Sequence, residues 1–185
     1  GIYNYQNAAA IDNVQLSSCT QGAMYINDVK FIGSLNPDTD NTSGYTSGAA
    51  DYTALPDKGK QVPGGGMNVF VETLSSVTNY LGSSIKAWID WNRDGDFSSS
   101  ELVYLMDAGY RTESVTFGFP IPNNLPLGDY RLRIAVLYST TGATLLPCDF
   151  STTNGEAEDY IFRVIEDNLA KLDTDQPNVF HRCEG

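Results

Sequence analysis

Apolar and polar residues alternate along several short runs of this 185-residue chain. In the run DYRLRIAVLY the apolar set is Tyr130, Leu132, Ile134, Val136 and Tyr138, and the arginines Arg131 and Arg133 fall between them. Alternation with a period of two is typical of a strand that is buried on one face. The pattern therefore predicts a strand whose even-numbered positions face a core and whose arginines face away from it.

Other runs show the same alternation or the residue types that strands favour. They are YINDVKFIG, MNVFVETL, SIKAWIDW, ESVTFGF and EDYIFRVIE. Stretches rich in Gly and Pro, such as VPGGG and PIPNNLPLGD, separate them. Many short strands joined by such turns predict an all-β fold, a two-sheet antiparallel β-sandwich of the jelly-roll or immunoglobulin-like kind. In SIKAWIDW, Trp88 is expected to point away from the face that carries Trp91.

The charge balance narrows the range of partners. The chain has 11 Lys and Arg against 23 Asp and Glu, a net charge of -12. Such a surface repels nucleic acid and anionic membranes and attracts divalent cations. No apolar run approaches the ~20 residues of a membrane span. The opening at Gly1, without a basic and apolar leader, is interpreted as a chain whose signal peptide has been removed, which predicts a secreted or cell-surface location.

The stretch DWNRDGDFSSSE has the spacing of a calcium-binding loop. Acidic or amide side chains occupy positions one, three and five, a glycine follows at the sharp turn, and a glutamate stands at position twelve. The predicted Ca²⁺ ligands are Asp90, Asn92, Asp94, Asp96 through its backbone carbonyl, and Glu101. The loop is expected to follow a strand, not a helix. The alternative is a surface turn that holds no ion.

A second acidic stretch, GEAEDY, brings Glu156, Glu158 and Asp159 close together just before an apolar run. Like charges at such short spacing repel one another unless something positive lies among them. That partner would be Arg131 or Arg133, or a second cation. The alternative is a solvated acidic turn.

Three cysteines and one sequon suggest modifications of an extracellular chain. Cys19 and Cys148 are expected to form a disulfide, which leaves Cys183 free or bonded to a neighbouring molecule. Three reduced thiols are the alternative. Asn41, in the sequence NTS, is a candidate glycosylation site.

In their order along the chain, YINDVKFIGSLN, AWIDWNRDGDFSSSE, LGDYRLRIAVLYS, PCDF and GEAEDY resemble the GEVED domain, a module of secreted bacterial proteins. The resemblance covers roughly residues 19–165, between extensions at 1–18 and 166–185. It implies a β-sandwich, an extracellular setting and a calcium site in the DWNRDGD loop. The family is not known as catalytic, and Ala157 here replaces the valine that is usual in its motif.

The expected function is therefore non-catalytic. No G-x-S-x-G or H-E-x-x-H motif occurs, and the single histidine lies near the end of the chain. We expect a calcium-binding structural or adhesive module, as a filament or adhesin subunit whose terminal extensions dock on other copies of itself. The alternative is a carbohydrate-binding accessory module of a secreted hydrolase or protease, with Trp88 as an exposed sugar platform.

Overall fold

The computed structural model describes residues 24–32, 35, 38–46, 48–75, 82–108, 113–138, 147 and 155–167. The predicted extension 1–18, most of 166–185 and the three cysteines Cys19, Cys148 and Cys183 lie outside these residues. Within them, no helix is long and apolar enough to cross a membrane.

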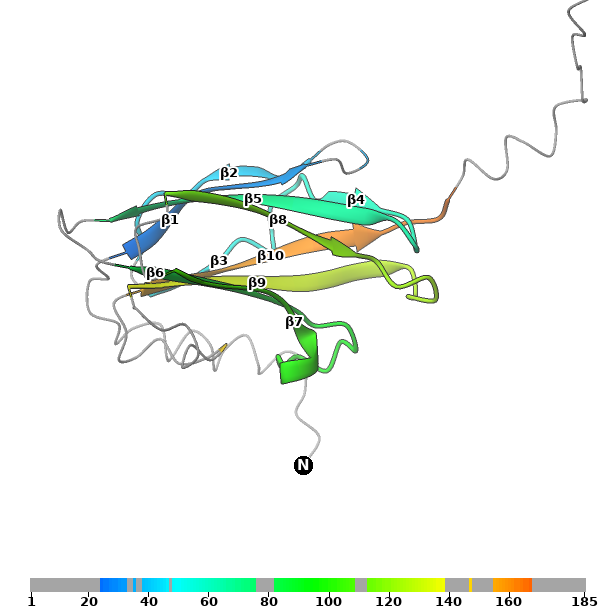
Figure 1. Ribbon diagram of the computed structural model, residues 1–185. Coiled ribbons are helices and arrows are strands. Elements are labelled where there is room, and N and C mark those ends of the chain that lie inside the picture. The colour runs from blue at the N-terminus through cyan, green and yellow to red at the C-terminus, as the bar shows by residue number, and fades with distance from the viewer. Residues whose placement is uncertain are drawn as a thin grey trace, which may run out of the picture.

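Two β-sheets pack face to face (Figure 1). The four-stranded sheet has the order β2 (Asp40–Thr42), β1 (Met24–Ile32), β5 (Gly66–Ser75) and β8 (Ser114–Pro120). The six-stranded sheet has the order β3 (Ala49–Asp51), β10 (Gly155–Val164), β9 (Gly128–Tyr138), β6 (Ser83–Ile89) and β7 (Leu102–Ala108), with β4 (Gly59–Gln61) also paired to β10. This arrangement confirms the predicted all-β sandwich.

Most neighbouring strands are antiparallel, and the two exceptions lie at one edge of the six-stranded sheet. The short strands β3 and β4 both pair parallel with β10. The six predicted strands are all present, whereas β2, β3, β4 and β7 were not among the predicted runs. β2, β3 and β4 span 3 residues each, which is too short for a period of two to be recognised in a sequence. In β7, LVYLMDA, apolar residues follow one another without alternation.

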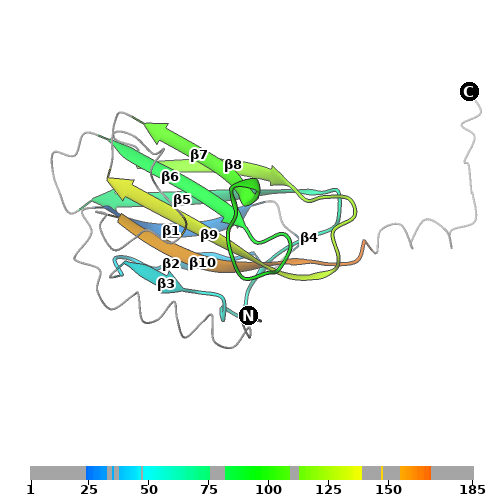
Figure 2. The ribbon, with the colours of Figure 1, turned by 90° about the horizontal axis from the view of Figure 1, so that it is seen from below.

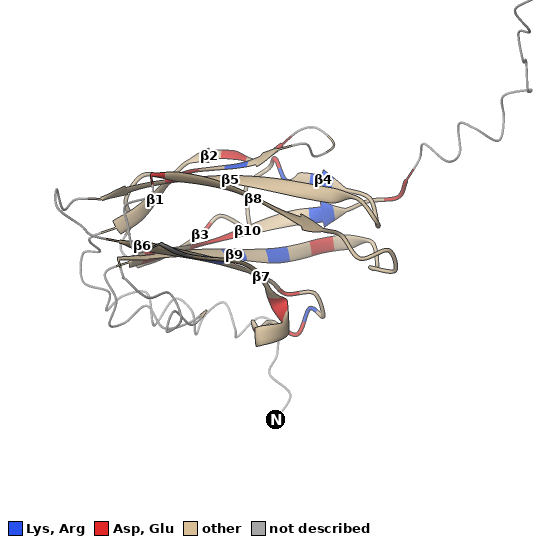
Figure 3. Cartoon of the chain, viewed as in Figure 1, with Lys and Arg blue, Asp and Glu red and all other residues tan. Residues whose placement is uncertain are grey.

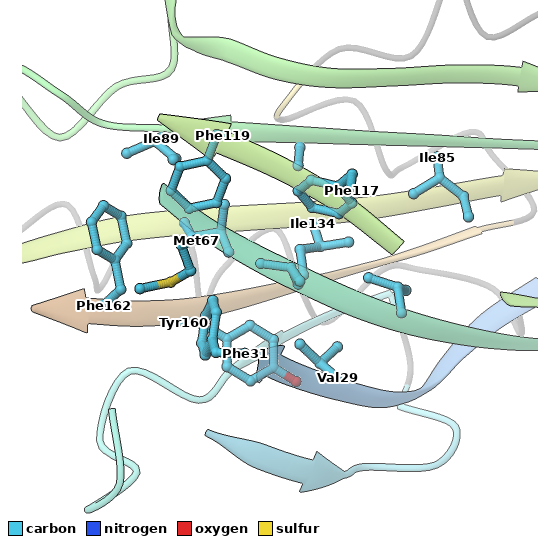
Figure 4. Close-up of a cluster of buried hydrophobic side chains, with 14 of the residues drawn as sticks. Val29, Phe31, Met67, Ile85, Ile89, Phe117, Phe119, Ile134, Tyr160 and Phe162 are labelled. Atoms are coloured by element: carbon cyan, nitrogen blue, oxygen red, sulfur yellow. The ribbon is translucent and has the colours of Figure 1, made fainter. Parts of the chain in front are cut away.

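The core fills the space between the sheets (Figure 4). The predicted inward positions of β9 and β10 are there, including Tyr130 and Tyr160, each 1 % exposed. Aromatic rings stack within it, with Tyr130 and Phe162 centroids 5.6 Å apart. Burial of one large apolar side chain contributes about 1.5–3 kcal/mol, so this layer is the main source of stability.

A smaller apolar cluster covers the outer face of the six-stranded sheet. It contains Trp88, Ala135, Leu137 and Ala157, with Phe97 packed against it. Trp91 packs on the main core instead. The two tryptophans therefore lie on opposite faces, as the alternation predicted, but both faces of β6 are buried.

Candidate functional site

The loop with calcium-type spacing connects β6 to β7, beside the edge of the six-stranded sheet (Figures 2 and 3). It starts at Asp90, whose backbone N–H donates to the Arg131 carbonyl of β9 at 3.0 Å. It ends in a single turn of 3₁₀ helix, η1 (Ser99–Glu101), directly before β7. The prediction that the loop follows a strand is confirmed.

Asp90 organises the first half of the loop. Its Oδ1 accepts the Asp94 N–H at 3.1 Å, and its Oδ2 accepts the Gly95 N–H at 3.0 Å. The side chain is only 3 % exposed. Burial raises the pKa of this carboxyl group, the Gly95 N–H opposes that shift, and the negative charge of Glu101 adds to it.

Glu101 closes the second half of the loop and is also 3 % exposed. Its Oε1 accepts the Trp91 N–H at 3.1 Å. Its Oε2 accepts the Ser98 N–H at 2.7 Å and the Ser98 hydroxyl at 2.9 Å. Sequence reasoning missed the role of Ser98, although Ser followed three residues later by Glu is the signature of a capping box.

The remaining predicted ligands lie at the exposed mouth of the loop. Asn92 Oδ1 accepts the Asp94 N–H, and Asp94 Oδ1 accepts the Asp96 N–H, each at 2.9 Å. Asn92 Nδ2 donates to Asp94 Oδ2 at 2.8 Å. Among the residues that the structure describes, no three Asp, Glu, His or Cys side chains form a ready-made metal-binding group. The structure thus brings these residues into one loop without closing them around a point.

Two residues of the loop have positive φ. Gly95, at φ 84°, occupies the sharp turn that the motif requires. Arg93, at φ 59°, turns out of the loop. Its guanidinium lies 4.0 Å from the centroid of the Tyr130 ring and donates to the carbonyls of Pro126 and Leu127 at 3.4 and 3.1 Å. The loop is thereby tied to the β8–β9 connection, and nothing in the sequence signalled this contact.

The acidic stretch GEAED forms the first half of β10 and is not a turn. The interpretation as a solvated acidic turn was therefore wrong, and the side chains divide between the two faces of the strand. Glu156 and Glu158, each 0 % exposed, share the inward face with Tyr160. Asp159 lies on the outer face. These acidic residues were predicted to precede the strand. In the structure they lie within it, and hydrogen bonds offset the free-energy cost of burying them.

On the outer face, Asp159 pairs with two arginines of β9. Its Oδ1 accepts Nε of Arg133 at 2.7 Å, and its Oδ2 accepts Nη2 of Arg133 at 2.7 Å and Nη2 of Arg131 at 2.5 Å. Arg133 is 5 % exposed and Asp159 4 %. Arginine was one of the two kinds of partner predicted for this acidic cluster, and it is the partner of Asp159.

Inside the sandwich, Glu156 joins the two sheets. Its Oε2 accepts the Ile26 N–H of β1 at 2.8 Å, where the β1–β5 pairing is irregular between Ile26 and Asp28. Its Oε1 accepts the Thr46 N–H at 2.8 Å and the Thr46 hydroxyl. Burial raises the pKa of Glu156 to about 7, and these hydrogen bonds restrain that rise.

Glu158 has fewer partners. Its Oε2 accepts the Tyr160 hydroxyl at 2.6 Å, and Asn41 Nδ2 donates to that hydroxyl at 2.9 Å. Its Oε1 is buried and makes no hydrogen bond of ordinary geometry with the described residues, although the Ser43 hydroxyl lies close enough to lower the pKa of the carboxyl group. Burial raises the pKa of Glu158 to about 8; the hydroxyls of Ser43 and Tyr160 oppose that rise, and the negative charges of Glu156 and Asp28 add to it. Burial, followed by the charge of Glu158, also raises the pKa of Tyr160.

The calcium-type loop and most of β10 fall within a single match to a known protein family. Residues 84–163 match the family model of the GEVED domain. This confirms the resemblance seen in the sequence for the segment from β6 to β10. No curated protein matches the chain.

The first residue of the GEVED motif has a steric role. A Cβ placed on Gly155 would lie 2.1 Å from the Val136 carbonyl oxygen and 3.0 Å from the Leu137 Cα. These are backbone atoms of β9, the strand that pairs with β10. Glycine is therefore required for the two strands to approach at the start of the motif.

Two further predicted sites have side chains that are already engaged within the protein. Trp88 is 3 % exposed beneath Phe97, so its ring offers no free face on which a sugar could stack. Asn41 donates its Nδ2, the atom that a glycan would modify, to the Tyr160 hydroxyl. Glycosylation there would replace an internal hydrogen bond, so the geometry does not favour it.

Proposed function

We propose that this chain is a non-catalytic, extracellular structural or adhesive module whose Asp90–Glu101 loop binds one Ca²⁺. The observation that carries the proposal is the burial of Asp90 and Glu101 at the two ends of one loop. Their partners are N–H and O–H groups. No ion pair joins either carboxylate to a Lys, Arg or His of the described residues, and two buried like charges favour a cation between them.

The donor set suits calcium. Every predicted ligand offers oxygen, and Ca²⁺ accepts 6–8 oxygen ligands in a flexible shell, roughly 2.3–2.6 Å away. Asp94 is exposed, so its side chain can turn toward the ion at little steric cost. Magnesium requires a stricter octahedron of shorter contacts. A loop in which Asp94 and Asp96 are exposed to solvent would form that geometry less readily.

The expected role of the ion is mechanical. Asp90 extends from β6, Glu101 precedes β7, and Arg93 holds the loop against the β8–β9 connection. A cation that cross-links both ends of the loop would stiffen this end of the sandwich, and it would offset the repulsion between the two carboxylates. Such reinforcement supports a load-carrying role outside the cell, where calcium is abundant.

Thermal unfolding with calcium or with EDTA tests the calcium site. A ligand that binds only the folded chain stabilises it by RT ln(1 + [L]/Kd), which is ~1 kcal/mol for a weak extracellular site near millimolar calcium. We expect calcium to raise the melting temperature of the wild type and not that of Asp94→Ala. Asp57→Ala removes the same charge at an exposed position outside the loop and should respond like the wild type. An equal melting temperature of the wild type in calcium and in EDTA would contradict the proposal.

The form of this module that we favour is the subunit of a surface filament, joined to other copies through its terminal extensions. The runner-up, a carbohydrate-binding accessory module, loses its proposed platform because Trp88 is buried. The extension 1–18 combines Tyr3 with Tyr5 and Val14 with Leu16 in local alternation. Each pair would face one side of an extended strand, which is what docking on a neighbouring sheet requires.

A further inference from the structure

The two sides of the sandwich differ in how their sheet edges are protected. On one side the outermost strands are β2, β3 and β4, and each spans 3 residues. On the other side the edges are β7 and β8, of 7 residues each. Neither β7 nor β8 has a second strand partner among the described residues. Very short edge strands resist pairing with other chains, whereas longer ones invite it.

The edge of β8 also lacks the charges that discourage strand addition. Its sequence, SVTFGFP, contains no Asp, Glu, Lys or Arg (Figure 3). The only protective residue is Pro120, at its end. Natural sheets commonly place lysine or other charged residues on free edges to prevent association, so an uncharged edge of this length is unusual for a surface with no partner.

The pairing register shows which backbone groups this edge offers. Thr73 N–H donates to the Glu113 carbonyl at 2.7 Å, and Ile121 N–H donates to the Gly65 carbonyl at 2.8 Å. Between these points β8 pairs with β5 without a register shift. Because hydrogen-bonded and non-hydrogen-bonded pairs alternate in an antiparallel ladder, odd-numbered residues of β8 direct their N–H groups toward β5.

The even-numbered residues therefore direct theirs away from the sheet. Ser114, Thr116 and Gly118 present outward N–H and C=O groups. Pro120 occupies an outward position, where its missing N–H costs no hydrogen bond within the sheet. The outer edge is thus a ladder that begins at Ser114 and stops at a proline.

An apolar hollow lies beside this ladder, between β8 and β7. It has a volume of about 250 Å³ and is lined by Trp91, Val103, Gly118, Phe119, Pro120 and Pro122. Close by, Tyr104 of β7 stacks on Phe117 of β8 with centroids 4.4 Å apart. A strand added to β8 would place alternate side chains over this gap, and an apolar or aromatic one would fill the hollow.

We infer that the free edge of β8 accepts residues 1–18 of a second copy of this chain as an added antiparallel strand. This inference rests on the filament form of the proposed function and specifies its acceptor surface. The segment supplies alternating apolar residues. It contains no Lys or Arg, and Asp12 is its only charged side chain. Backbone hydrogen bonds would provide affinity, and the hollow would provide specificity.

Chain direction agrees with this pairing. Met24 of β1 pairs with Ser75, and Ser114 of β8 pairs with Glu72, so β1 and β8 start at the same end of the sheet. If the pairing extends to residue 18, docking on the same copy requires residues 19–23 to pass three strand spacings, roughly 14 Å, with a greatest reach of roughly 17 Å. Because β8 offers only 7 residues, pairing by the first part of the segment would leave a longer connection and would fit the same copy as well. Cross-links between two differently labelled copies distinguish the two arrangements.

The first test is the concentration dependence of assembly. Thr116→Pro removes one outward N–H, whereas Thr116→Val retains it. We expect the wild type and Thr116→Val to form species larger than the 20.2 kDa chain as concentration rises, seen by sedimentation velocity and electron microscopy. Thr116→Pro should remain a monomer with the melting temperature of the wild type. If Thr116→Pro lowers the melting temperature, Ser114→Pro, at the first residue of the strand, takes its place in the test.

The outcomes separate the acceptor from the function. Assembly of the proline variant like that of the wild type would overturn β8 as the acceptor and leave the filament proposal intact. A wild type that is monomeric at every concentration would overturn both. Neither result would affect the calcium test, which is made on the single chain.

A second test identifies the donor. Tyr5 is replaced by the photoreactive aromatic benzoylphenylalanine in a ¹⁵N-labelled copy, which is mixed with unlabelled wild type and irradiated. The inference predicts a cross-linked peptide between the labelled segment 1–18 and unlabelled β8 or β7. Cross-links confined to one copy, or directed to another surface, would overturn it.

Discussion

The burial of Glu158 predicts an unusual dependence of stability on pH. Its pKa is raised from an ordinary value of 4.5 to about 8. A carboxyl group with a raised folded-state pKa binds its proton more tightly in the folded chain than in the unfolded chain. Its stabilising contribution is therefore complete below pH 4.5 and is lost as pH rises to about 8.

The size of this effect follows from the same shift. Each pH unit between the two pKa values changes the free energy of unfolding by about 1.4 kcal/mol, so the whole interval amounts to roughly 5 kcal/mol. The side chain is 0 % exposed, so little solvent is available to screen its charge. Glu156, with a pKa raised to about 7, should titrate over an overlapping range.

Glu158→Gln isolates the contribution of this group. Glutamine has the shape of the protonated acid, and its amide oxygen can still accept the Tyr160 hydroxyl. We expect the variant to match the wild type near pH 5 and to exceed it progressively toward pH 8, by several kcal/mol at most. Urea unfolding followed by tryptophan fluorescence, at fixed calcium concentration from pH 5 to 9, measures the difference.

The matched control is Glu166→Gln, which removes the same charge at an exposed position. Its difference from the wild type should stay nearly constant with pH. A Glu158→Gln variant that is less stable than the wild type at pH 8 would refute the reasoning. That result would mean that the carboxylate is ionised in the folded chain and paired with a positive group.

Three further substitutions probe the motif and the loop. Asp159→Ala leaves the buried Arg133 without its carboxylate and should cost about 3–5 kcal/mol in urea unfolding, whereas the exposed Asp51→Ala should cost less than about 1 kcal/mol. Gly155→Ala should lower stability by about 1–3 kcal/mol or more, because its Cβ meets the backbone of β9; a neutral effect in thermal unfolding would contradict this. Arg93→Ala should weaken calcium binding measured by calorimetry, by loosening the loop from the Tyr130 ring, and unchanged affinity would show that the contact does not position the ligands.

The main strands could be predicted because their burial is one-sided. In β9 the alternation from Tyr130 to Tyr138 identified the inward face directly. The alternative of a solvated turn for the GEAED stretch was wrong because acidic residues, which normally mark solvent exposure, are buried here. The burial of Glu156 in this stretch depends on hydrogen bonds from Ile26 and Thr46, which lie more than a hundred positions away in sequence. A local sequence pattern cannot indicate partners at that separation.

The calcium-type loop was placed correctly for a different reason. Its spacing is local, so Asp90, Gly95 and Glu101 took up the expected turn geometry regardless of the sheets around them. The contact from Arg93 to the Tyr130 ring is not local. It depends on how β6 and β9 lie side by side, and alternation predicts faces but not the order of strands in a sheet.

The position of β10 in the sequence has a consequence for how the chain folds. β10 is the last strand, yet it pairs with β3 and β4, which precede it by about a hundred residues. During synthesis these early segments emerge without their partner and cannot close the six-stranded sheet until residues 155–164 arrive. Folding dominated by such distant pairings is slow. The chain is therefore expected to gain its final stability in one late, cooperative step.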